Sequence, residues 1–305
     1  MKPDEIKNKT ILLSALNWGM GHVSRCIPII HQLIEQNNQL IIACSLNQEK
    51  IYKNYFPHLI YIEHNDFPFK FKGNGNFEHD LTFNFIQLYK RFQLEKKEVE
   101  KITSKYAVDI IISDHRYSFI SKKCYSIFLT HQINLPVSWY MKWIDRIHKK
   151  LVSQFNFVWI IDNLDSKYAG KLSRNKTLKK AEYIGIKSRF SLYPKEEKII
   201  PTVVIISGPE PYAELFFNSQ LKIAQTKIDK TVFIVPKKYI LENESETIEI
   251  IQSNNWKQID SIILKAQKII SRAGYSTIMD IVFLQTNSEL IPTPGQKEQE
   301  YLIKK

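Results

Sequence analysis

Short apolar runs alternate with amphipathic stretches along the first half of the chain. Residues 11–16 are almost wholly apolar, which is typical of a buried strand, and residues 22–36 place apolar side chains at helical spacing. Residues 39–45 return to a strand pattern, so these three segments predict a β-α-β unit. The further strands predicted in this half cover residues 59–63, 108–113, 126–130 and 157–161, and the further helices cover residues 80–105 and 136–155.

A second series of the same kind follows a polar stretch at residues 187–200. Its predicted strands cover residues 201–207, 230–235, 268–271 and 289–291, and its predicted helices cover residues 209–224, 255–266, 274–284 and 297–305. Regular alternation of this kind implies parallel strands with helices on both faces of a sheet. The sequence therefore predicts an α/β protein with one domain at residues 1–186, a linker at 187–200 and a second domain at 201–305.

Glycine is scarce, with nine residues in a chain of 305. A chain this poor in glycine keeps it mostly where another side chain would be strained. Five of the nine lie at predicted strand-to-helix turns, namely Gly19, Gly21, Gly208, Gly274 and Gly295. In open parallel sheets ligands bind at these turns, and the N–H groups of the helix N-termini suit a phosphate.

Composition and charge indicate which partners and which cellular compartment to expect. The net charge of +12 fits a phosphorylated ligand or an anionic membrane, although compositional bias explains it equally well. No nucleic-acid-binding module is recognisable, so we expect no nucleic-acid partner. Three cysteines without a C-x-x-C pair and an N-terminus without an apolar segment predict a cytoplasmic protein with reduced thiols.

The loop N-W-G-M-G-H at residues 17–22 joins the first predicted strand to its helix. It is not a dinucleotide fingerprint, because G-x-G-x-x-G would need a glycine where Ser24 stands. Gly19 and Gly21 let the backbone pass close to a ligand, and His22 stands at the start of the helix. The alternative interpretation is a tight turn whose histidine caps the helix or packs.

Two segments near the C-terminus carry a more specific pattern: S-R-A-G-Y-S-T-I-M-D at residues 271–280 and P-T-P-G-Q-K-E-Q-E-Y at residues 292–301. Small hydroxyl residues at a helix start suit a diphosphate, and a carboxylate further along suits ribose hydroxyls. The Gln and Glu side chains of the second segment can hydrogen-bond a sugar. The loop S-G-P-E-P at residues 207–211 is a weaker signal, which an ordinary turn also explains.

Together with I-S-D-H-R at residues 112–116 and T-H-Q-I-N at residues 130–134, these motifs resemble the GT-B glycosyltransferases of family 28, the group of the peptidoglycan GlcNAc transferase, and within it a bacterial branch. The resemblance covers nearly the whole chain. It implies two Rossmann-like domains facing across a cleft, with a nucleotide-sugar donor on the C-terminal domain and an acceptor on the N-terminal one. Family members usually continue beyond the segment that matches E-Q-E-Y, so we expect a C-terminally short form of the second domain.

The resemblance also assigns binding residues by position. It implies that the nucleotide base and diphosphate contact Arg189, Ser207, Gly208, Arg272, Gly274, Ser276 and Thr277. Asp280 would bind the ribose in place of the glutamate of the family. Gln299 and Glu300 match a Gln-Gln pair that contacts the donor sugar, so the Glu changes the choice of sugar. Gly19 and Gly21 would form the acceptor loop.

The implied reaction is transfer of a sugar, an N-acetylhexosamine, from a UDP-sugar to a hydroxyl acceptor with inversion. A base must take the acceptor proton, and the candidates are His22, Asp114 and His131. His22 is favoured because an ordinary histidine pKa of about 6.5 suits base work near neutral pH. Two alternative interpretations stay open: Asp114 caps the turn after its strand, and His131 is a packed histidine without a catalytic role. The sequence has no D-x-D motif, so we expect no metal and no cofactor besides the UDP-sugar substrate.

The predicted helix at residues 136–155 has two faces. The stripe expected to face the core is Val137, Tyr140, Ile144, Ile147 and Leu151. A second stripe, aromatic and basic, is Trp139, Trp143, Arg146 and Lys150. An aromatic and basic face is typical of a membrane-surface helix, and residues 167–180 add basic but no acidic side chains. A sugar or lipid-linked acceptor and peripheral contact with the inner face of an anionic membrane would fit; an ordinary solvated face stays open.

Two other functions stay open. G-M-G-H-V-S-R-C at residues 19–26 also resembles the opening of the UDP-sugar hydrolases of the pseudaminate pathway, which share this fold. A non-catalytic nucleotide-sugar-binding protein is the second alternative. Whether UDP release requires an acceptor separates the transferase from the hydrolase, and donor binding without turnover indicates the binding protein.

Overall fold

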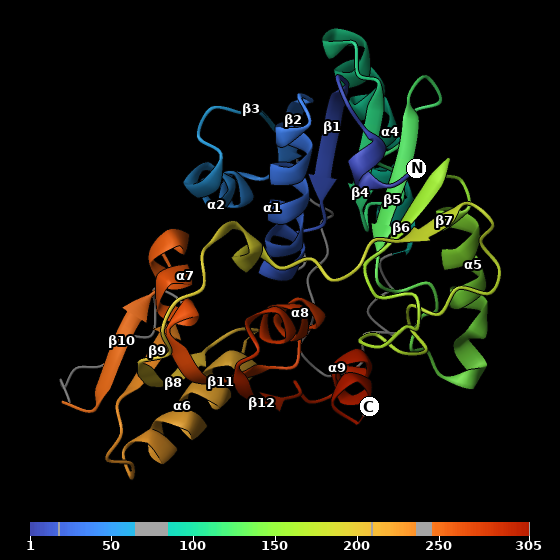
Figure 1. Cartoon of the computed structure of the whole chain (residues 1–305). Coiled ribbons are helices and arrows are strands. Elements are labelled where there is room, and N and C mark those ends of the chain that lie inside the picture. The colour runs from blue at the N-terminus through green and yellow to red at the C-terminus, as the bar shows by residue number, and fades with distance from the viewer. Residues whose placement is uncertain (18, 65–84, 209, 236–245, 305) are drawn as a thin grey trace. The chain divides into compact units, whose positions relative to one another are not determined.

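A computed structural model describes residues 1–17, 19–64, 85–208, 210–235 and 246–304 of the chain (Figure 1). The described residues form two compact units, one ending at Arg189 and the other beginning at Phe190. We call them the N-terminal unit and the C-terminal unit. The boundary falls inside the polar stretch at residues 187–200, at the short 3-10 helix η3 (Arg189–Leu192).

The N-terminal unit is built on one parallel sheet with the strand order β3-β2-β1-β4-β5-β6-β7. In chain order the strands are β1 (Thr10–Ala15), β2 (Gln39–Cys44), β3 (Ile60–Glu63), β4 (Ile110–Asp114), β5 (Tyr125–Thr130), β6 (Phe157–Ile160) and β7 (Ala181–Tyr183). The order runs outward in one direction from β1 to β3 and in the other from β4 to β7. The gap between β1 and β4 is therefore the switch point at which ligands bind in sheets of this kind.

Helices cover both faces of this sheet. They are η1 (Pro3–Glu5), α1 (Met20–Glu35), α2 (Leu46–Tyr55), α4 (Phe85–Tyr106), η2 (Trp139–Met141) and α5 (Lys142–Val152). Leu12, Ile41 and Ile111 of the sheet pack with Val99 of α4 on one face. Figure 1 shows α1 and α2 on the opposite face of the same strands.

The C-terminal unit repeats the plan with a smaller parallel sheet in the order β10-β9-β8-β11-β12. Its strands are β8 (Ile200–Ile205), β9 (Thr231–Val235), β10 (Ile248–Gln252), β11 (Ala266–Arg272) and β12 (Asn287–Ile291), and its helices are α6 (Tyr212–Ala224), α7 (Trp256–Leu264), α8 (Tyr275–Leu284) and α9 (Lys297–Ile303). Phe216 and Phe217 of α6 pack on one face of the sheet, and Ile259 and Ile263 of α7 pack on the other. The switch point of this unit lies between β8 and β11.

The predicted α/β class is confirmed, but the prediction of one helix over residues 136–155 is wrong. The described chain forms the 3-10 turn η2 and then α5, which begins only at Lys142. The predicted core-facing stripe is also wrong in part, because Tyr140 and Ile147 are exposed and the buried side chains of α5 are His148 and Val152. The first turn of the predicted helix at 80–105 and Pro209 of the helix at 209–224 lie outside the described residues.

Candidate active site

The three candidate catalytic side chains lie together at the carboxyl edge of the N-terminal sheet. Asp114 is the last residue of β4, His22 lies in the first turn of α1 after β1, and His131 follows the end of β5. β1 and β4 are paired strands, with Ala15 in register with Asp114. The parallel sheet thus brings residues from three separate segments to its switch point.

Asp114 is fully buried, and its carboxylate contacts Arg25, His22 and the thiol of Cys26. Arg25 donates from Nε to Oδ2 over 2.8 Å and from Nη2 to Oδ1, and Nδ1 of His22 lies 3.1 Å from Oδ2. Burial alone would raise the pKa of Asp114, but the Arg25 guanidinium and His22 outweigh that effect and hold the pKa well below its ordinary range. Asp114 is therefore a carboxylate.

His22 is the partly exposed member of the group, with 16% of its side chain accessible. Burial lowers the pKa of His22, Arg25 lowers it further, and Asp114 opposes both effects. The ring is therefore uncharged at neutral pH, which is the state from which a histidine accepts a proton. Its Nε2 atom has no hydrogen-bond partner among the described residues.

Nδ1 of His22 has two contacts that exclude each other. It lies 3.1 Å from Oδ2 of Asp114, which can only accept a proton, and 2.8 Å from Nη2 of Arg25, which can only donate one. If Nδ1 carries the proton, it donates to Asp114 and leaves Nε2 as a base. If it does not, its lone pair faces the carboxylate, while Nη2 of Arg25 already has Oδ1 of Asp114 as an acceptor. The first arrangement is the more favourable one.

Two members of this cluster were missed from the sequence. Arg25 is buried, and its Nη1 lies 2.9 Å from Nδ1 of His131. The signal was present, because residues three apart on a helix share a face, and Arg25 stands three places after His22. His115 was missed because nothing in its spacing marks it; it has a φ of 57°, and its Nε2 lies 2.7 Å from Oγ1 of Thr130.

The loop before α1 and the end of the unit meet at the same edge. Gly19 is the N-cap of α1 with a φ of 96°, a conformation that favours glycine, and Gly21 lies in the first turn. Arg189 donates from Nη1 to Oγ of Ser24 on α1 over 2.9 Å. Arg189, assigned by resemblance to a donor diphosphate, therefore contacts the helix that carries His22.

The carboxyl edge of the C-terminal sheet carries most of the predicted donor-binding residues. Ser207 and Gly208 follow β8 and are exposed, and Gly208 has a φ of 111°. Gly274 is the N-cap of α8, with Ser276 and Thr277 in the first turn. Because β8 and β11 are neighbours, these two turns flank the switch point of this sheet. Asp280 lies one turn further along α8 and is mostly buried.

Arg272, the last residue of β11, connects the first residue of α6 with the segment that follows β12. Its Nη1 donates to the carbonyl of Pro292 over 2.9 Å, its Nη2 donates to the carbonyl of Tyr212 over 2.8 Å, and its guanidinium lies 4.4 Å from the ring centre of Phe216. Burial lowers the pKa of Arg272. Its Nε is buried without a hydrogen-bond partner among the described residues.

Gln299 and Glu300 hold the loop that precedes their own helix. Oε1 of Gln299 accepts a hydrogen bond from the backbone N–H of Thr293 over 2.7 Å, and Oε1 of Glu300 accepts one from Gly295 over 3.2 Å. Two buried hydroxyls in this region, those of Ser271 and Thr293, have no partner among the described residues. Unpaired buried hydroxyls are costly, so polar groups of a ligand would be favourable here.

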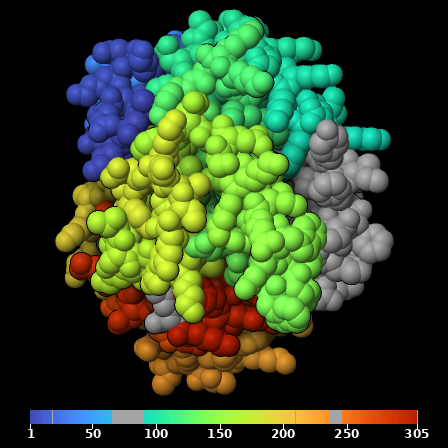
Figure 2. Space-filling model, turned by 90° about the vertical axis from the view of Figure 1, so that its right-hand side faces the viewer, coloured from blue at the N-terminus to red at the C-terminus, as the bar shows by residue number. Residues whose placement is uncertain are grey.

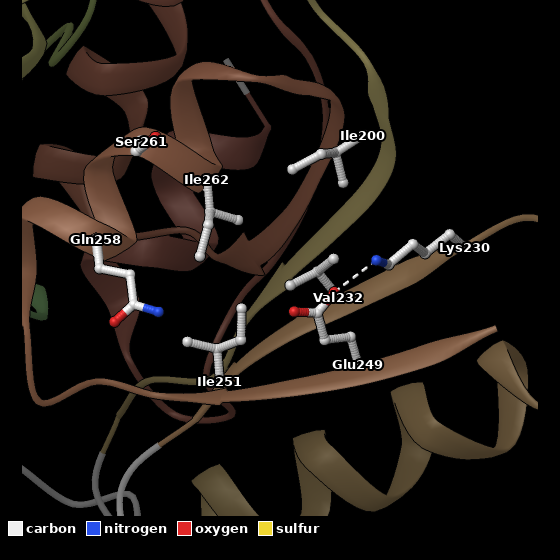
Figure 3. Close-up of a pocket in the computed structure, with 8 residues that line it drawn as sticks. All are labelled: Ile200, Lys230, Val232, Glu249, Ile251, Gln258, Ser261 and Ile262. Carbon is white, nitrogen blue, oxygen red and sulfur yellow. Dashed lines mark ion pairs between the residues drawn. The ribbon is translucent and has the colours of Figure 1, made fainter. Parts of the chain in front are cut away.

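A pocket of about 400 Å³ lies elsewhere in the C-terminal unit, between α7 and the strands β8 to β10 (Figure 3). It is lined by Ile200, Lys230, Val232, Glu249, Ile251, Gln258, Ser261 and Ile262. Lys230, which directly precedes β9, forms an ion pair of 2.6 Å with Glu249 of β10. None of the predicted site residues lines this pocket. Within the described ranges, no group of three or more His, Cys, Asp or Glu side chains is arranged to hold a metal ion.

Residues 196–302 match the family model described as the glycosyltransferase family 28 C-terminal domain. The match spans most of the C-terminal unit and includes the turns after β8 and β11. No protein of curated function matches the chain in sequence.

The fold of the whole chain is similar to that of solved glycosyltransferases. The glycotransferase of kitacinnamycin has a TM-score of 0.63 at 10% identity, over 98% of this chain and 85% of that chain. Spinosyn rhamnosyltransferase SpnG complexed with thymidine diphosphate has a TM-score of 0.57 at 12% identity, over 97% and 84%. MurG of Acinetobacter baumannii has a TM-score of 0.53 at 13% identity, over 97% and 82%. The predicted GT-B fold is therefore confirmed.

Proposed function

We propose that this protein is a glycosyltransferase that moves an N-acetylhexosamine from a UDP-sugar to a hydroxyl of a sugar or lipid-linked acceptor, with inversion and without a metal ion. The observation that carries the proposal is the His22–Asp114 pair at the switch point of the N-terminal sheet, in a chain of GT-B fold. A partly exposed histidine held by a buried carboxylate is an arrangement that removes a proton from a hydroxyl.

In the proposed reaction the acceptor hydroxyl gives its proton to Nε2 of His22. Its oxygen attacks the anomeric carbon from the side opposite the diphosphate, whose bond to that carbon breaks with the electron pair leaving on the phosphate oxygen. The resulting imidazolium keeps its Nδ1–H on Asp114, and the carboxylate stabilises the charge. Attack from the opposite face inverts the configuration of the sugar.

The donor belongs to the C-terminal unit in this proposal. The turn at Gly208 and the N-terminus of α8 offer backbone N–H groups to the diphosphate, and Ser276 and Thr277 add hydroxyls. Asp280 is assigned to the ribose. Main-chain groups of this kind stabilise the leaving diphosphate without a cation, so we expect turnover to survive incubation with EDTA. A loss of turnover that Mg²⁺ or Mn²⁺ restores would refute metal independence.

The deciding experiment measures UDP release from a set of UDP-sugars, with and without simple sugar acceptors, in the wild type and in His22→Ala. We expect acceptor-dependent release that falls by about 10²–10⁴-fold in the variant. His31→Ala is the matched control, since His31 lies on the same helix with an exposed side chain and should leave the rate unchanged. Release without an acceptor would indicate a hydrolase, and donor binding without release would indicate a binding protein.

We also propose that the acceptor is lipid-linked and that η2 and α5 contact an anionic membrane surface. Trp139 is 80% exposed, and Tyr140, Trp143 and Ile147 are exposed beside it. Exposed lysines and Arg146 share the helix, and a surface that combines aromatic and basic side chains suits anionic headgroups. In the described part of the chain, no helix combines the length and the apolarity that a membrane crossing needs.

Vesicle co-sedimentation tests this contact. The full chain should pellet with vesicles that contain anionic lipid, and Trp139→Ser with Trp143→Ser should release it. Ile228→Ser removes an equally exposed apolar side chain from the C-terminal unit and should have no effect. Binding that survives both tryptophan substitutions, or that the control also abolishes, would contradict the assignment.

A further inference from the structure

Arg25 lies at the centre of the N-terminal site. Only 2% of its side chain is exposed, and its guanidinium contacts both oxygens of Asp114, Nδ1 of His22 and Nδ1 of His131. A buried guanidinium with one carboxylate and two imidazoles around it does more than neutralise a charge, because it donates to Nδ1 of His131 and orients the carboxylate that faces Nδ1 of His22.

We propose that Arg25 is a positioning residue that gives the two histidines opposite roles, with His22 as the proton acceptor and His131 as a hydrogen-bond donor. The inference rests on the proposed function. It names the residue that determines which of the candidate bases in that site can accept a proton.

The role of His131 follows from the chemistry of the guanidinium. Nη1 of Arg25 lies 2.9 Å from Nδ1 of His131, and a guanidinium nitrogen can only donate. Nδ1 of His131 must therefore accept, so the ring proton is on Nε2. In this tautomer Nε2 carries the N–H group, so it has no lone pair with which to take a proton from an acceptor.

The role of His22 follows from the two bonds between Arg25 and Asp114. These bonds fix the plane of the carboxylate, so that Oδ2 lies 3.1 Å from Nδ1 of His22. With Nδ1–H donating to Oδ2, the lone pair of His22 is on Nε2. Arg25 therefore sets opposite tautomers in two rings that stand on either side of His115, with ring centres 5.3 Å and 5.8 Å from that of His115.

Arg25 also supplies a positive charge beside His22 and Asp114. The titratable groups facing His22 are Arg25 and Cys26 on α1, Asp114 and His115 at the end of β4, and His131 after β5. Burial raises the pKa of the Cys26 thiol and lowers that of His115 far below its ordinary value, so both groups are uncharged. Without Arg25 the Asp114 carboxylate would favour a protonated His22, which cannot act as a base.

The test is ¹⁵N NMR of the histidine rings in the full chain, with the exposed His31 as an internal reference. In the wild type we expect the proton on Nδ1 of His22 and on Nε2 of His131. In Arg25→Gln the pKa of His22 should rise and the tautomer preference of His131 should disappear. A wild-type His131 protonated on Nδ1, or rings unchanged by the substitution, would overturn the proposal.

Arg25→Lys separates the charge from the geometry. It keeps a cation beside Asp114 but has no planar fork to reach Asp114 and His131 together. The pKa of His22 should stay low while His131 loses its fixed tautomer, and a variant whose two rings change together would contradict the division of roles.

Turnover is the second readout. The acid limb of the kcat profile should move to higher pH in Arg25→Gln and stay in place in Arg25→Lys, with about a tenfold loss at pH 7 for the Gln variant. A purely structural role would lower Tm without moving the limb. The ring tautomers are measured without substrate, so a wild type with the expected tautomers but no transferase activity would refute the proposed function and leave the role of Arg25 standing.

Discussion

The carboxyl edges of the two sheets consist of different kinds of chemical group. At the N-terminal edge the site consists of side chains that carry charge or protons: Asp114, Arg25, His22, His115 and His131 bond or stack with one another and are almost wholly buried. All eight histidines of the chain lie before residue 149, and the sequence of the C-terminal unit has none.

At the C-terminal edge the same position in the fold is occupied by main chain and small side chains. Gly208, Gly274 and two hydroxyls surround the switch point, and the longer residues hold loops in place. Arg272 binds two carbonyls, and Gln299 accepts a backbone N–H. Buried polar atoms of Ser271, Arg272 and Thr293 lack partners among the described residues.

The difference follows from what each edge has to do in the proposed reaction. Proton transfer needs a side chain with a set pKa and orientation, which requires a preformed network. A diphosphate needs N–H groups and room, and the ligand itself completes the hydrogen bonds. Substitutions that change side-chain charge should therefore impair turnover at the N-terminal edge. Substitutions that change the backbone or the support of the loops should impair donor binding at the C-terminal edge.

Asp114→Asn should have the largest effect. Turnover should fall by about 10³–10⁴-fold, because Asn cannot hold the Nδ1–H tautomer of His22. The free energy of unfolding should fall by about 3–5 kcal/mol, since Arg25 stays buried without its carboxylate. Steady-state kinetics and urea unfolding measure the two effects.

Asp162→Asn is the control for that experiment. Asp162 is equally buried in the same unit and accepts hydrogen bonds from Tyr168, Ala169 and Ser173, with no histidine among these partners. It should lose stability but keep the turnover of the folded protein. Equal losses of turnover in both variants would mean that Asp114 acts only through folding.

Acidification should weaken the N-terminal unit selectively. Burial lowers the pKa of His22 and His115, and that of His148 to about 4. Between pH 6.5 and 4 the unfolded chain binds protons at these rings that the folded unit excludes, so stability falls as pH falls. Below about pH 4 the protonation of Asp114 in the unfolded state continues the loss, because its folded pKa is depressed.

Hydrogen exchange with mass spectrometry measures this in the intact chain, because peptides report each unit separately. Protection factors, corrected for the intrinsic pH dependence of exchange, should drop between pH 7 and pH 5 in β1, β4 and α1. They should change little in β8 and β11. An equal drop of the protection factors in both units would contradict the claim that the histidines make the N-terminal unit more sensitive to acid.

The sequence predicts most of the fold because the buried parallel strands are continuous apolar runs. Two of the elements it misses lack that signal: α2 buries only three side chains, and β7 has none that is fully buried. The strand β10 (Ile248–Gln252) was also missed, although three of its five residues are isoleucine. The helix at 136–155 was placed too early because Trp139 and Tyr140 fit a helical stripe, whereas both are exposed in η2.

The candidate site is predictable to a similar degree. Strand-to-helix turns placed His22, Asp114 and His131 at one edge, because the ends of parallel strands meet there. The network that connects them depends on Arg25 and on the left-handed backbone of His115, and neither pairing nor backbone conformation can be derived from spacing alone. Likewise, nothing in the sequence shows that Arg272 binds two carbonyls.

Arg272→Met should have an intermediate effect, confined to the second edge. The substitution keeps the apolar stem but leaves the carbonyls of Tyr212 and Pro292 without their donors, which costs about 2–4 kcal/mol of unfolding free energy. KM for the donor should rise by about tenfold with little change in kcat, because the loops that hold the ligand lose their brace.

Lys268→Met is the matched control on the same strand. Lys268 forms an ion pair of 2.8 Å with Glu289 at a partly exposed site, and such pairs contribute little. Donor KM and stability should stay close to those of the wild type. If kcat falls in Arg272→Met while the donor KM does not rise, Arg272 contacts the reacting groups and is more than a brace.

The smallest expected effect distinguishes Gly208 from Gly274, two glycines at the C-terminal edge that differ in their backbone φ. A Cβ added at Gly208 would lie 3.8 Å from Oγ1 of Thr293, and a Cβ added at Gly274 would lie 3.8 Å from Oγ1 of Thr277, so neither meets a clash. Gly208 has a φ of 111°, however, and Gly274 has a φ of −71°. Gly208→Ala should therefore cost about 1–2 kcal/mol of unfolding free energy, and Gly274→Ala less than about 0.5.

Donor titrations on the same pair of variants extend the comparison to binding. If Gly208 serves only to turn the chain, weaker donor binding should follow the loss of stability and appear in Gly208→Ala alone. If the diphosphate lies against the N-terminus of α8, the added methyl group of Gly274→Ala should raise the donor Kd although the fold is unharmed. An unchanged Kd in both variants would mean that the diphosphate does not bind at this edge. The two sheets would then differ in structure, and that difference would not be explained by donor binding.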